Sequence, residues 1–153
     1  MEMKMKMKTI CGDITQQRGI LVHQVNCQKT MGAGLALRMK TKFPQHYQDY
    51  LAHAPELGSI VVSELRPDLV IAGLYAQDKC GISRVQTDYR AFEACLQKLK
   101  KVSGQYPQLP VYFPSRIGCG LAGGNWNIIQ SYLRLYFPQG ILVQYRPAEE
   151  VTL

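Results

Sequence analysis

The chain has 153 residues, of which 46% are hydrophobic and 19% are charged, and its formal net charge is +7. A chain of this length can bury its own core as one domain, and this ordinary balance of residue types argues against disorder. The excess of basic residues favours anionic partners such as nucleotides, pyrophosphates or nucleic acid, but carries no information about the fold.

The N-terminal half begins with two predicted strands. Residues 5–10 alternate between apolar and polar side chains, as a strand with one buried face does, and residues 19–25 form the short apolar run of a buried strand. Residues 32–42 predict a helix that begins at glycines, and Pro44 marks its end or a kink.

The rest of the chain continues the alternation of strands and helices. Residues 59–64 and 69–75 are rich in Ile and Val and predict two more strands. Asp88 is expected to cap a helix that runs to about Val102, because apolar residues recur there at helical spacing. The last predicted elements are a strand at residues 110–113, a helix and a strand at residues 141–145. The helix carries on one side Trp126, Ile129, Tyr132, Leu133 and Tyr136.

Strands that alternate with helices predict an α/β domain, in which helices cover both faces of a mainly parallel sheet. Ligands bind such sheets at the carboxyl ends of the strands. Two glycine-rich loops, residues 26–36 and 115–126, each follow a predicted strand and precede a predicted helix. Glycine lets backbone amides approach a ligand, and a helix N-terminus offers unpaired N–H groups, so we expect an anion site. Taken alone, the glycines of the first loop could equally serve only a tight turn.

Several familiar motifs are absent or stand in the wrong context. Gly118, Gly120 and Gly123 match the GxGxxG pattern, but a dinucleotide-binding loop should open the fold and be followed by an acidic residue about 20 positions later. Neither loop is a Walker A motif, and no cysteine begins a Cys-x5-Arg phosphatase loop. A nucleophilic Cys119 paired with His23 is a less favoured alternative to a small residue in a tight loop.

The histidines and cysteines predict neither a metal site nor disulfides. The three histidines have no metal-ligand spacing, and the five cysteines, which lack CxxC spacing, are expected to be free thiols in a reducing compartment. His23, near the end of its strand, is expected to be a satisfied strand residue or to face the site. The chain shows no charged-then-apolar leader and no apolar run of the roughly 18 residues that cross a bilayer. We therefore expect a cytoplasmic monomer without metal, cofactor or membrane contact.

Three motifs, in this order, resemble the macro domain family: GDIT at residues 12–15, the loop at residues 26–34 and the loop at residues 117–126. The pieces MGAGLA, from Met31, and IGCGL, from Ile117, are most similar to the branch that contains terminal ADP-ribose–protein glycohydrolase and ADP-ribose 1''-phosphate phosphatases. The resemblance spans nearly the whole chain. It implies that residues 1–153 form a single macro domain, a three-layer α/β/α fold with a mixed, mostly parallel central sheet of about six strands.

The resemblance implies that the ligand is ADP-ribose, free or attached to a macromolecule. Asp13 would accept a hydrogen bond from the adenine amino group while capping the turn after the first strand, and Asn26 would reach the distal ribose. The first glycine loop would hold one phosphate, and the second would hold the other phosphate and the distal ribose. Tyr145 and residues 151–153 lie where the family closes the adenine pocket. The ligand-binding residues predicted on this basis are Asp13, Ile14, Asn26, Met31, Gly32, Ala33, Gly34, Leu35, Ile117, Gly118, Cys119, Gly120, Leu121 and Ala122.

The catalytic residues of this branch are only partly matched. Its glycohydrolases use an Asp directly after GCGL and a Lys after the fourth strand, whereas this chain has Ala122 and, in the most natural register, Gln77 at those positions. Lys79 could serve only if the loop shifted by two residues. The candidate catalytic residues are Asn26, His23 and Lys79.

Hydrolysis of an ADP-ribose derivative is the favoured function. The reaction would be either removal of ADP-ribose from modified protein carboxylates or dephosphorylation of ADP-ribose 1''-phosphate. A non-catalytic ADP-ribose reader is the alternative, because Ala122 stands where the branch has a carboxylate. Nucleic-acid binding ranks last, because no run of basic and aromatic residues marks a base-stacking platform.

Overall fold

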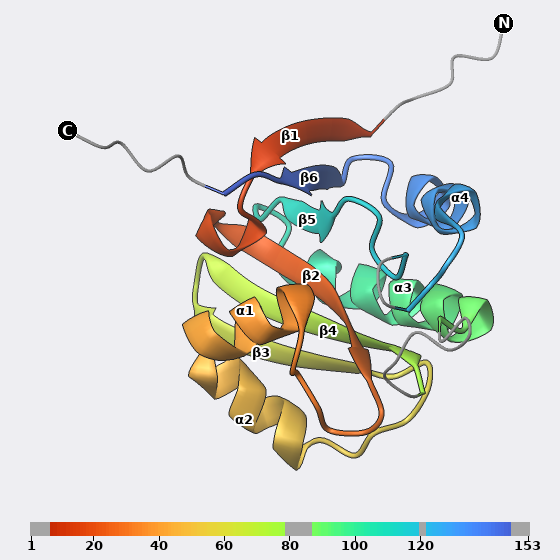
Figure 1. Ribbon diagram of the computed structural model, residues 1–153. Helices are drawn as coiled ribbons and strands as arrows, with labels where there is room; N and C mark the ends of the chain where they lie inside the picture. Colours follow the sequence, from red (N-terminus) through yellow and green to blue (C-terminus); the bar gives the residue numbers. More distant parts are fainter. Residues whose placement is uncertain (1–6, 79–86, 120–121, 148–153) are drawn as a thin grey trace, which may run out of the picture.

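The computed structural model describes residues 7–78, 87–119 and 122–147 of the chain. Within these residues, six strands form one sheet in the order β1-β6-β5-β2-β4-β3 (Figure 1). The strands are β1 (Lys8–Gly12), β2 (Gly19–Asn26), β3 (Ile60–Arg66), β4 (Leu69–Gln77), β5 (Val111–Pro114) and β6 (Ile141–Tyr145). The helices are α1 (Gly34–Lys42), α2 (Pro44–Ala52), α3 (Tyr89–Gly104) and α4 (Trp126–Tyr136), and a short 3-10 helix spans Ile14–Gln16. None of these helices combines the length and the apolar character that crossing a membrane requires.

Every strand pair in this sheet is parallel except the antiparallel pair of β3 and β4. Five strands therefore end at the same edge of the sheet. The residues at these carboxyl ends are Gly12, Asn26, Gln77, Pro114 and Tyr145. All three sequence motifs begin at or just after one of these ends, so the topology gathers them along the edge where such sheets bind ligands.

Helices cover both faces of the sheet, with α1 and α2 on one face and α3 and α4 on the other (Figure 1). The central strand β2 sends Ile20 and Val22 into the core under α3 and α4, whereas its Leu21 packs with Met39 of α1. Its neighbour β4 is buried along its whole length up to Gln77. Burial on both faces explains why these two strands are nearly continuous apolar runs. The predicted three-layer α/β/α fold with a mixed, mostly parallel sheet is confirmed.

The ends of the elements differ from the prediction mainly near the N-terminus and around Pro44. The first strand covers Lys8–Gly12, whereas the prediction is residues 5–10, of which residues 5 and 6 lie outside the described part of the chain. The sequence pattern does not predict α2, because Pro44 indicates an end or a kink. In the structure Pro44 is the first residue of a new helix, where its fixed φ suits the helix and its missing N–H needs no partner. The predicted cap of α3 is confirmed, since the Asp88 carboxylate accepts a hydrogen bond of 2.9 Å from the N–H of Ala91.

A substitution at Leu99 of α3 tests whether the core is packed as described. Its side chain is 0% exposed, whereas that of Leu135 in α4 is 66% exposed. Leu99→Ala should lower the free energy of unfolding by about 2–5 kcal/mol, because it removes buried methyl groups and leaves a cavity. Leu135→Ala should change it by less than about 0.5 kcal/mol. Urea unfolding followed by circular dichroism measures both, and equal losses in the two variants would contradict this description of the core.

Candidate functional site

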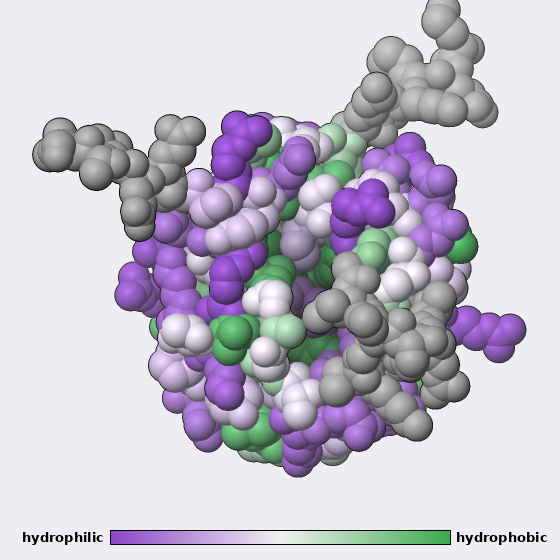
Figure 2. All heavy atoms as spheres, in the orientation of Figure 1, coloured by the Kyte–Doolittle hydropathy of each residue, from purple (hydrophilic) through white to green (hydrophobic). Residues whose placement is uncertain are grey.

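A cavity of about 610 Å³ lies at the carboxyl edge of the sheet, between the two glycine-rich loops. Figure 2 shows a hollow near the centre of the face drawn, with apolar side chains within it and polar residues around it. The ends of β2 and β4, the start of α1 and the residues that follow β5 provide the walls of the cavity. The predicted residues that line it are His23, Asn26, Gly32, Ala33, Gly34, Leu35, Ile117, Gly118 and Ala122.

Other predicted residues lie away from this cavity. Asp13 borders a separate hollow. Ile14 and Met31 are each 2% exposed and pack in the core, and Cys119 packs against the apolar cluster under α3 and α4. Outside the described residues lie Lys79, Gly120, Leu121 and residues 151–153. The functional roles of all the predicted residues stay predictions.

Cys119 does not have the surroundings of a reactive cysteine. Its Sγ donates a hydrogen bond of 3.4 Å to the carbonyl of Ile117. Burial raises the pKa of the Cys119 thiol, although the charge of Arg116 lowers it in part. Because the thiolate is the nucleophilic form, these surroundings favour the interpretation of Cys119 as a small residue in a tight loop.

The wall of the cavity carries little charge. Arg116 is the one charged side chain among its described residues, and none of them is Asp or Glu. The side-chain polar groups there come from neutral residues such as Gln24, Thr30 and Ser115. In the part of the chain that the structure describes, no three His, Cys, Asp or Glu side chains converge as a metal site would. An anion in the cavity would therefore meet no opposing carboxylate from these residues.

The first glycine-rich loop ends at an uncapped helix N-terminus. Ala33 occupies the N-cap of α1 and makes no side-chain hydrogen bond, whereas Asp88 caps α3 and Asn125 caps α4. Among the described residues, no side chain accepts a hydrogen bond from the first N–H groups of α1, at a place that lines the cavity. Gly34 begins the helix with a φ of +57°, a conformation that glycine adopts without strain. This N-terminus can hold an anion such as a phosphate.

Asn26 shapes the same loop with its side chain. Its Oδ1 accepts hydrogen bonds of 2.9 Å from the N–H of Gln28 and from the hydroxyl of Tyr50, and its Nδ2 donates one of 2.9 Å to the carbonyl of Thr30. Lys29, within the turn, has a φ of 60°, which non-glycine residues seldom adopt. A ligand that contacts the Asn26 amide must therefore share or replace one of these partners.

The second loop is held by residues outside any sequence motif. The Thr87 hydroxyl donates a hydrogen bond of 2.7 Å to the Gly118 carbonyl and accepts one of 3.0 Å from Gln24 Nε2. The N–H of Gly124 donates to the same carbonyl at 2.8 Å. Gly118 has a φ of +75°, and a Cβ there would lie 2.7 Å from Gln24 Oε1, so this position requires glycine. No sequence pattern indicates that Thr87 and Gln24 support the site, because their role depends on contacts between segments that are distant in sequence.

His23 belongs to a buried chain of polar side chains. Its Nε2 lies 2.8 Å from His46 Nε2, and His46 Nδ1 lies 2.8 Å from the Ser63 hydroxyl oxygen. Each neutral imidazole carries one N–H, so the proton between the two Nε2 atoms belongs to one histidine or the other, and Ser63 accepts or donates accordingly. His23 Nδ1 has no hydrogen-bond partner among the described residues. One imidazole nitrogen is therefore left unpaired at a residue that lines the cavity.

Both of these histidines are neutral at neutral pH. Burial, with a further contribution from the neighbouring His46, lowers the pKa of His23 well below its ordinary value. Burial also lowers the pKa of His46 to about 4, although the charge of Asp49 raises it in part. The pair adds no charge to the cavity wall, and either ring can hold the proton that lies between the two Nε2 atoms.

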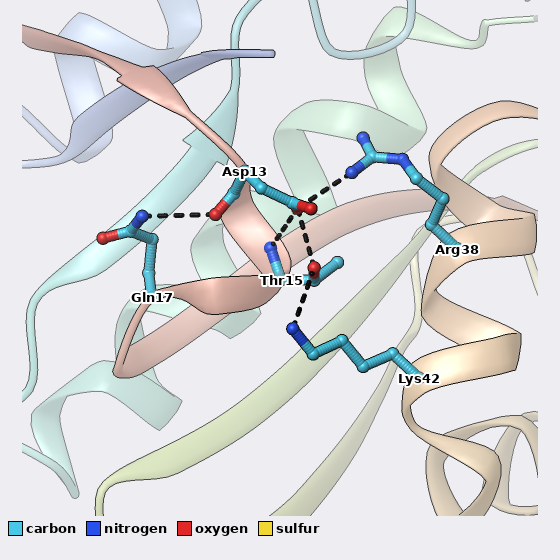
Figure 3. Close-up of polar contacts among 5 residues, drawn as sticks. All are labelled: Asp13, Thr15, Gln17, Arg38 and Lys42. Carbon is cyan, nitrogen blue, oxygen red and sulfur yellow. Dashed lines mark hydrogen bonds and ion pairs between the residues drawn. The ribbon is translucent and has the colours of Figure 1, made fainter. Parts of the chain in front are cut away.

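Asp13, directly after β1, binds its own turn and α1 (Figure 3). Its Oδ1 accepts hydrogen bonds from the N–H and the hydroxyl of Thr15, at 2.9 and 2.7 Å, and pairs with Nη1 of Arg38 at 2.8 Å. Burial raises the pKa of Asp13, but the hydrogen bonds from Thr15 and the charges of Arg38 and Lys42 outweigh it and lower the pKa overall. The ionised carboxylate borders a hollow of about 380 Å³, which is also lined by Thr15, Leu37, Arg38, Thr41 and Lys42.

The histidine pair predicts that the fold is sensitive to mild acid. The folded-state pKa of His46 is about 4 and that of an exposed histidine is about 6.5, so between these values the unfolded chain binds a proton that the folded chain does not. The free energy of unfolding should therefore fall from pH 7 to pH 5, by on the order of 2 kcal/mol for one such histidine.

His46→Gln should flatten this pH dependence. Ser63→Ala keeps both histidines, and it should lower the free energy of unfolding at both pH values without flattening the slope. Urea unfolding of the three proteins at the two pH values measures this, and a slope unchanged in His46→Gln would contradict the account of the pair.

Comparisons with known proteins identify relatives over most of the chain. The chain is 30% identical over 143 residues to an uncharacterized 17.5 kDa protein from the tk-vs intergenic region of Enterobacteria phage T4, a match that covers 86% of this chain and 90% of the relative. It is 26% identical over 144 residues to an ADP-ribose 1''-phosphate phosphatase of Scheffersomyces stipitis, which covers 76% of this chain and 83% of that protein. No protein-family model matches the chain.

Solved macrodomains share the fold. The macrodomain of Mycobacterium tuberculosis DarG has a TM-score of 0.72 at 20% identity, and the match covers 94% of this chain and 99% of that one. Thermosipho africanus DarTG in complex with ADP-ribose has a TM-score of 0.69 at 18% identity, over 99% of this chain and 45% of that one. The fold, the relatives and the three ordered motifs agree, and the chain belongs to the macro domain family.

Proposed function

We propose that this protein binds ADP-ribose in the cavity between its two glycine-rich loops and hydrolyses an ADP-ribose derivative. The observation that carries the proposal is the wall of this cavity, where glycine backbones and an uncapped helix N-terminus come together and no described residue is a carboxylate. Backbone N–H groups at a helix N-terminus are suited to a pyrophosphate, which is a doubly charged acceptor. Residues 1–153 would act as one domain around this site.

The proposed pose follows the order of the strand ends. The distal ribose would lie between Asn26 and Gly118, and the pyrophosphate would lie across the start of α1, where Gly32 and Gly34 line the cavity. The adenine would then reach toward Asp13, at the end of β1. In this pose the adenine would lie at the end of β1 and the distal ribose at the ends of β2 and β5, on the far side of β6 from β1.

The comparisons support this assignment. The Thermosipho africanus DarTG structure, which shares the fold, is a complex with ADP-ribose. The Scheffersomyces stipitis relative is an ADP-ribose 1''-phosphate phosphatase. Both relatives support the proposal that the ligand of this chain contains ADP-ribose. The second relative also supports hydrolysis of a 1''-phosphate as the reaction.

His23 is our candidate for the group that activates water. Ala122, where related glycohydrolases carry an aspartate, is 6% exposed and apolar, and Lys79 lies outside the described residues. His23 Nδ1 is buried, so the reacting water would have to enter beside it, and the ring would have to carry its proton on Nε2. The water would then give a proton to Nδ1 while its oxygen forms a bond to the phosphorus or to the ester carbon. The bond to the leaving oxygen then breaks, and that oxygen takes the proton back from His23. N–H groups of the loops would stabilise the charge that develops on the attacked group.

A non-catalytic ADP-ribose reader is the second candidate function. Ala122 contributes no acid or base to the cavity. The Asn26 side chain, another candidate for orienting a water, is already engaged within its own loop. Binding and turnover must therefore be measured separately.

Calorimetry with ADP-ribose, followed by two turnover assays, tests these functions. The assays measure phosphate released from ADP-ribose 1''-phosphate and ADP-ribose released from a protein modified on its carboxylates. Turnover that His23→Gln abolishes without loss of ADP-ribose binding would support the hydrolase and the role of His23. Binding without turnover on either substrate would establish the reader, and no binding would contradict both functions.

Gly32 allows the phosphate site to be tested without damage to the fold. A Cβ at Gly32 would meet no atom within 4 Å, and Gly32 lines the cavity. Gly32→Ala should therefore change the free energy of unfolding by less than about 0.5 kcal/mol. It should weaken ADP-ribose binding by about tenfold or more, because its methyl group would occupy the space through which a phosphate reaches the loop amides.

Gly104→Ala is the matched control for this substitution. A Cβ at Gly104 also meets no atom within 4 Å, but this glycine ends α3 and does not line the cavity. It should keep the wild-type affinity in the same calorimetric titration. Wild-type affinity in Gly32→Ala would place the phosphates elsewhere.

A further inference from the structure

Arg38 contacts both groups that the sequence assigns to the adenine. Its Nη1 lies 2.8 Å from Asp13 Oδ1, and its Cζ lies 3.8 Å from the centroid of the Tyr145 ring. The side chain of Arg38 is 30% exposed and that of Asp13 is 23% exposed. A base that pairs with Asp13 must therefore either displace the guanidinium or rest against it.

The arrangement leaves one side of the guanidinium for a ligand. The Cζ atom of Arg38 lies over the Tyr145 ring at contact distance, so the ring covers one side of the guanidinium. Arg38 borders the hollow beside Asp13, whereas Tyr145 does not. A ligand that stacks on Arg38 would therefore use the side turned away from the Tyr145 ring.

Asp13 likewise keeps one oxygen for a ligand. All its side-chain hydrogen bonds fall on Oδ1, which Figure 3 shows between Thr15 and Arg38. Within the described residues, Oδ2 accepts no hydrogen bond. An ionised carboxylate can only accept hydrogen bonds. The free oxygen can therefore bind an amino group, whereas it would repel the oxygen of a carbonyl.

Displacing Arg38 would be unfavourable. It would separate a half-buried ion pair and a cation–π contact with the more exposed Tyr145 ring, and it would remove one of the three donors to Asp13 Oδ1. A base that stacks on Arg38 keeps all of these contacts and adds one more. A guanidinium plane accepts aromatic stacking, whereas the ammonium of Lys42 in the same hollow cannot.

We propose that Arg38, held by its contacts with Tyr145 and Asp13, is the platform on which the adenine base stacks while its amino group meets Asp13 Oδ2. This inference rests on the proposed function, and it adds a specificity-determining residue that no sequence motif contains. Arg38 would provide surface for stacking, and Asp13 would determine the specificity for a base with an amino group over one with a carbonyl group.

Calorimetry with three probes tests the platform: ADP-ribose, its hypoxanthine analogue and inorganic pyrophosphate. Arg38→Met and Arg38→Lys should each weaken binding of both base-containing probes by about tenfold, since stacking on a planar group is lost, and should leave pyrophosphate binding unchanged. The preference for adenine over hypoxanthine should persist, because Asp13 is still present. Lys40→Met, which removes a charge from the same helix but lies outside the lining of the hollow, is the control and should stay within about threefold of the wild type.

Four results would overturn the proposal. Wild-type affinity in Arg38→Lys would mean that only the positive charge matters, and tighter binding in Arg38→Met would mean that Arg38 blocks the site. Loss of the adenine preference in Arg38→Met would mean that Arg38 only positions Asp13. If the wild type itself does not bind ADP-ribose, the proposed function fails and this inference fails with it. Circular dichroism of each variant verifies that the fold is retained.

Discussion

The parallel pairing of β1, β6, β5, β2 and β4 is the constraint on which the rest of this structure depends. Parallel strands that share one sheet all end at one edge, and each is followed there by a loop that leads back over a face. Segments as distant in sequence as residues 12–15 and 115–118 thus come to lie along a single line. The core under the helices fixes that edge, because β2 and β4 are buried on both faces and cannot shift register without exposing apolar side chains.

The proposed site handles anionic charge with backbone rather than with cationic side chains. The chain carries a net charge of +7, yet only Arg116 is charged among the described residues of the cavity wall. Oriented N–H groups at the start of α1 are fixed in place before a ligand arrives, so they need little rearrangement to bind one. The neutral His23–His46 pair keeps the wall uncharged, and the remote basic residues would act by steering an anion toward the cavity.

The sequence predicts those parts of the fold that depend on local patterns. The range predicted for β6 is the one observed, α4 contains the apolar positions predicted for that helix, and Asp88 caps α3 as its position before an apolar helical repeat indicates. The helix that begins at Pro44 is not predicted, because a proline that follows the end of one helix can also be the first residue of the next. The glycine loops could be predicted because a glycine in the sequence indicates where the backbone needs a positive φ or a close approach to a ligand.

The supporting contacts could not be predicted, because they join segments far apart in sequence. His46 is a polar residue in a weakly amphipathic helix, and nothing nearby indicates that it lies buried against His23. Thr87 meets Gly118 across 31 residues, and Arg38 meets Asp13 across 25. Such pairs are set by the sheet order rather than by any local pattern. The motifs therefore identify the edge and its glycines, whereas the structure adds the residues that hold them.

Amide NMR of the labelled protein during a titration with ADP-ribose tests the central claim most directly, because the claim concerns backbone N–H groups. If the pyrophosphate binds between the two glycine-rich loops, the largest changes in chemical shift should fall on the amides of Gly32, Gly34 and Gly118, which line the cavity. Further changes should appear at Asp13 and Ile14. The amide of Gly104, at the far end of α3, should not move. Shifts confined to surface lysines and arginines, with the three cavity glycines unchanged, would contradict a pyrophosphate site built from the two glycine-rich loops.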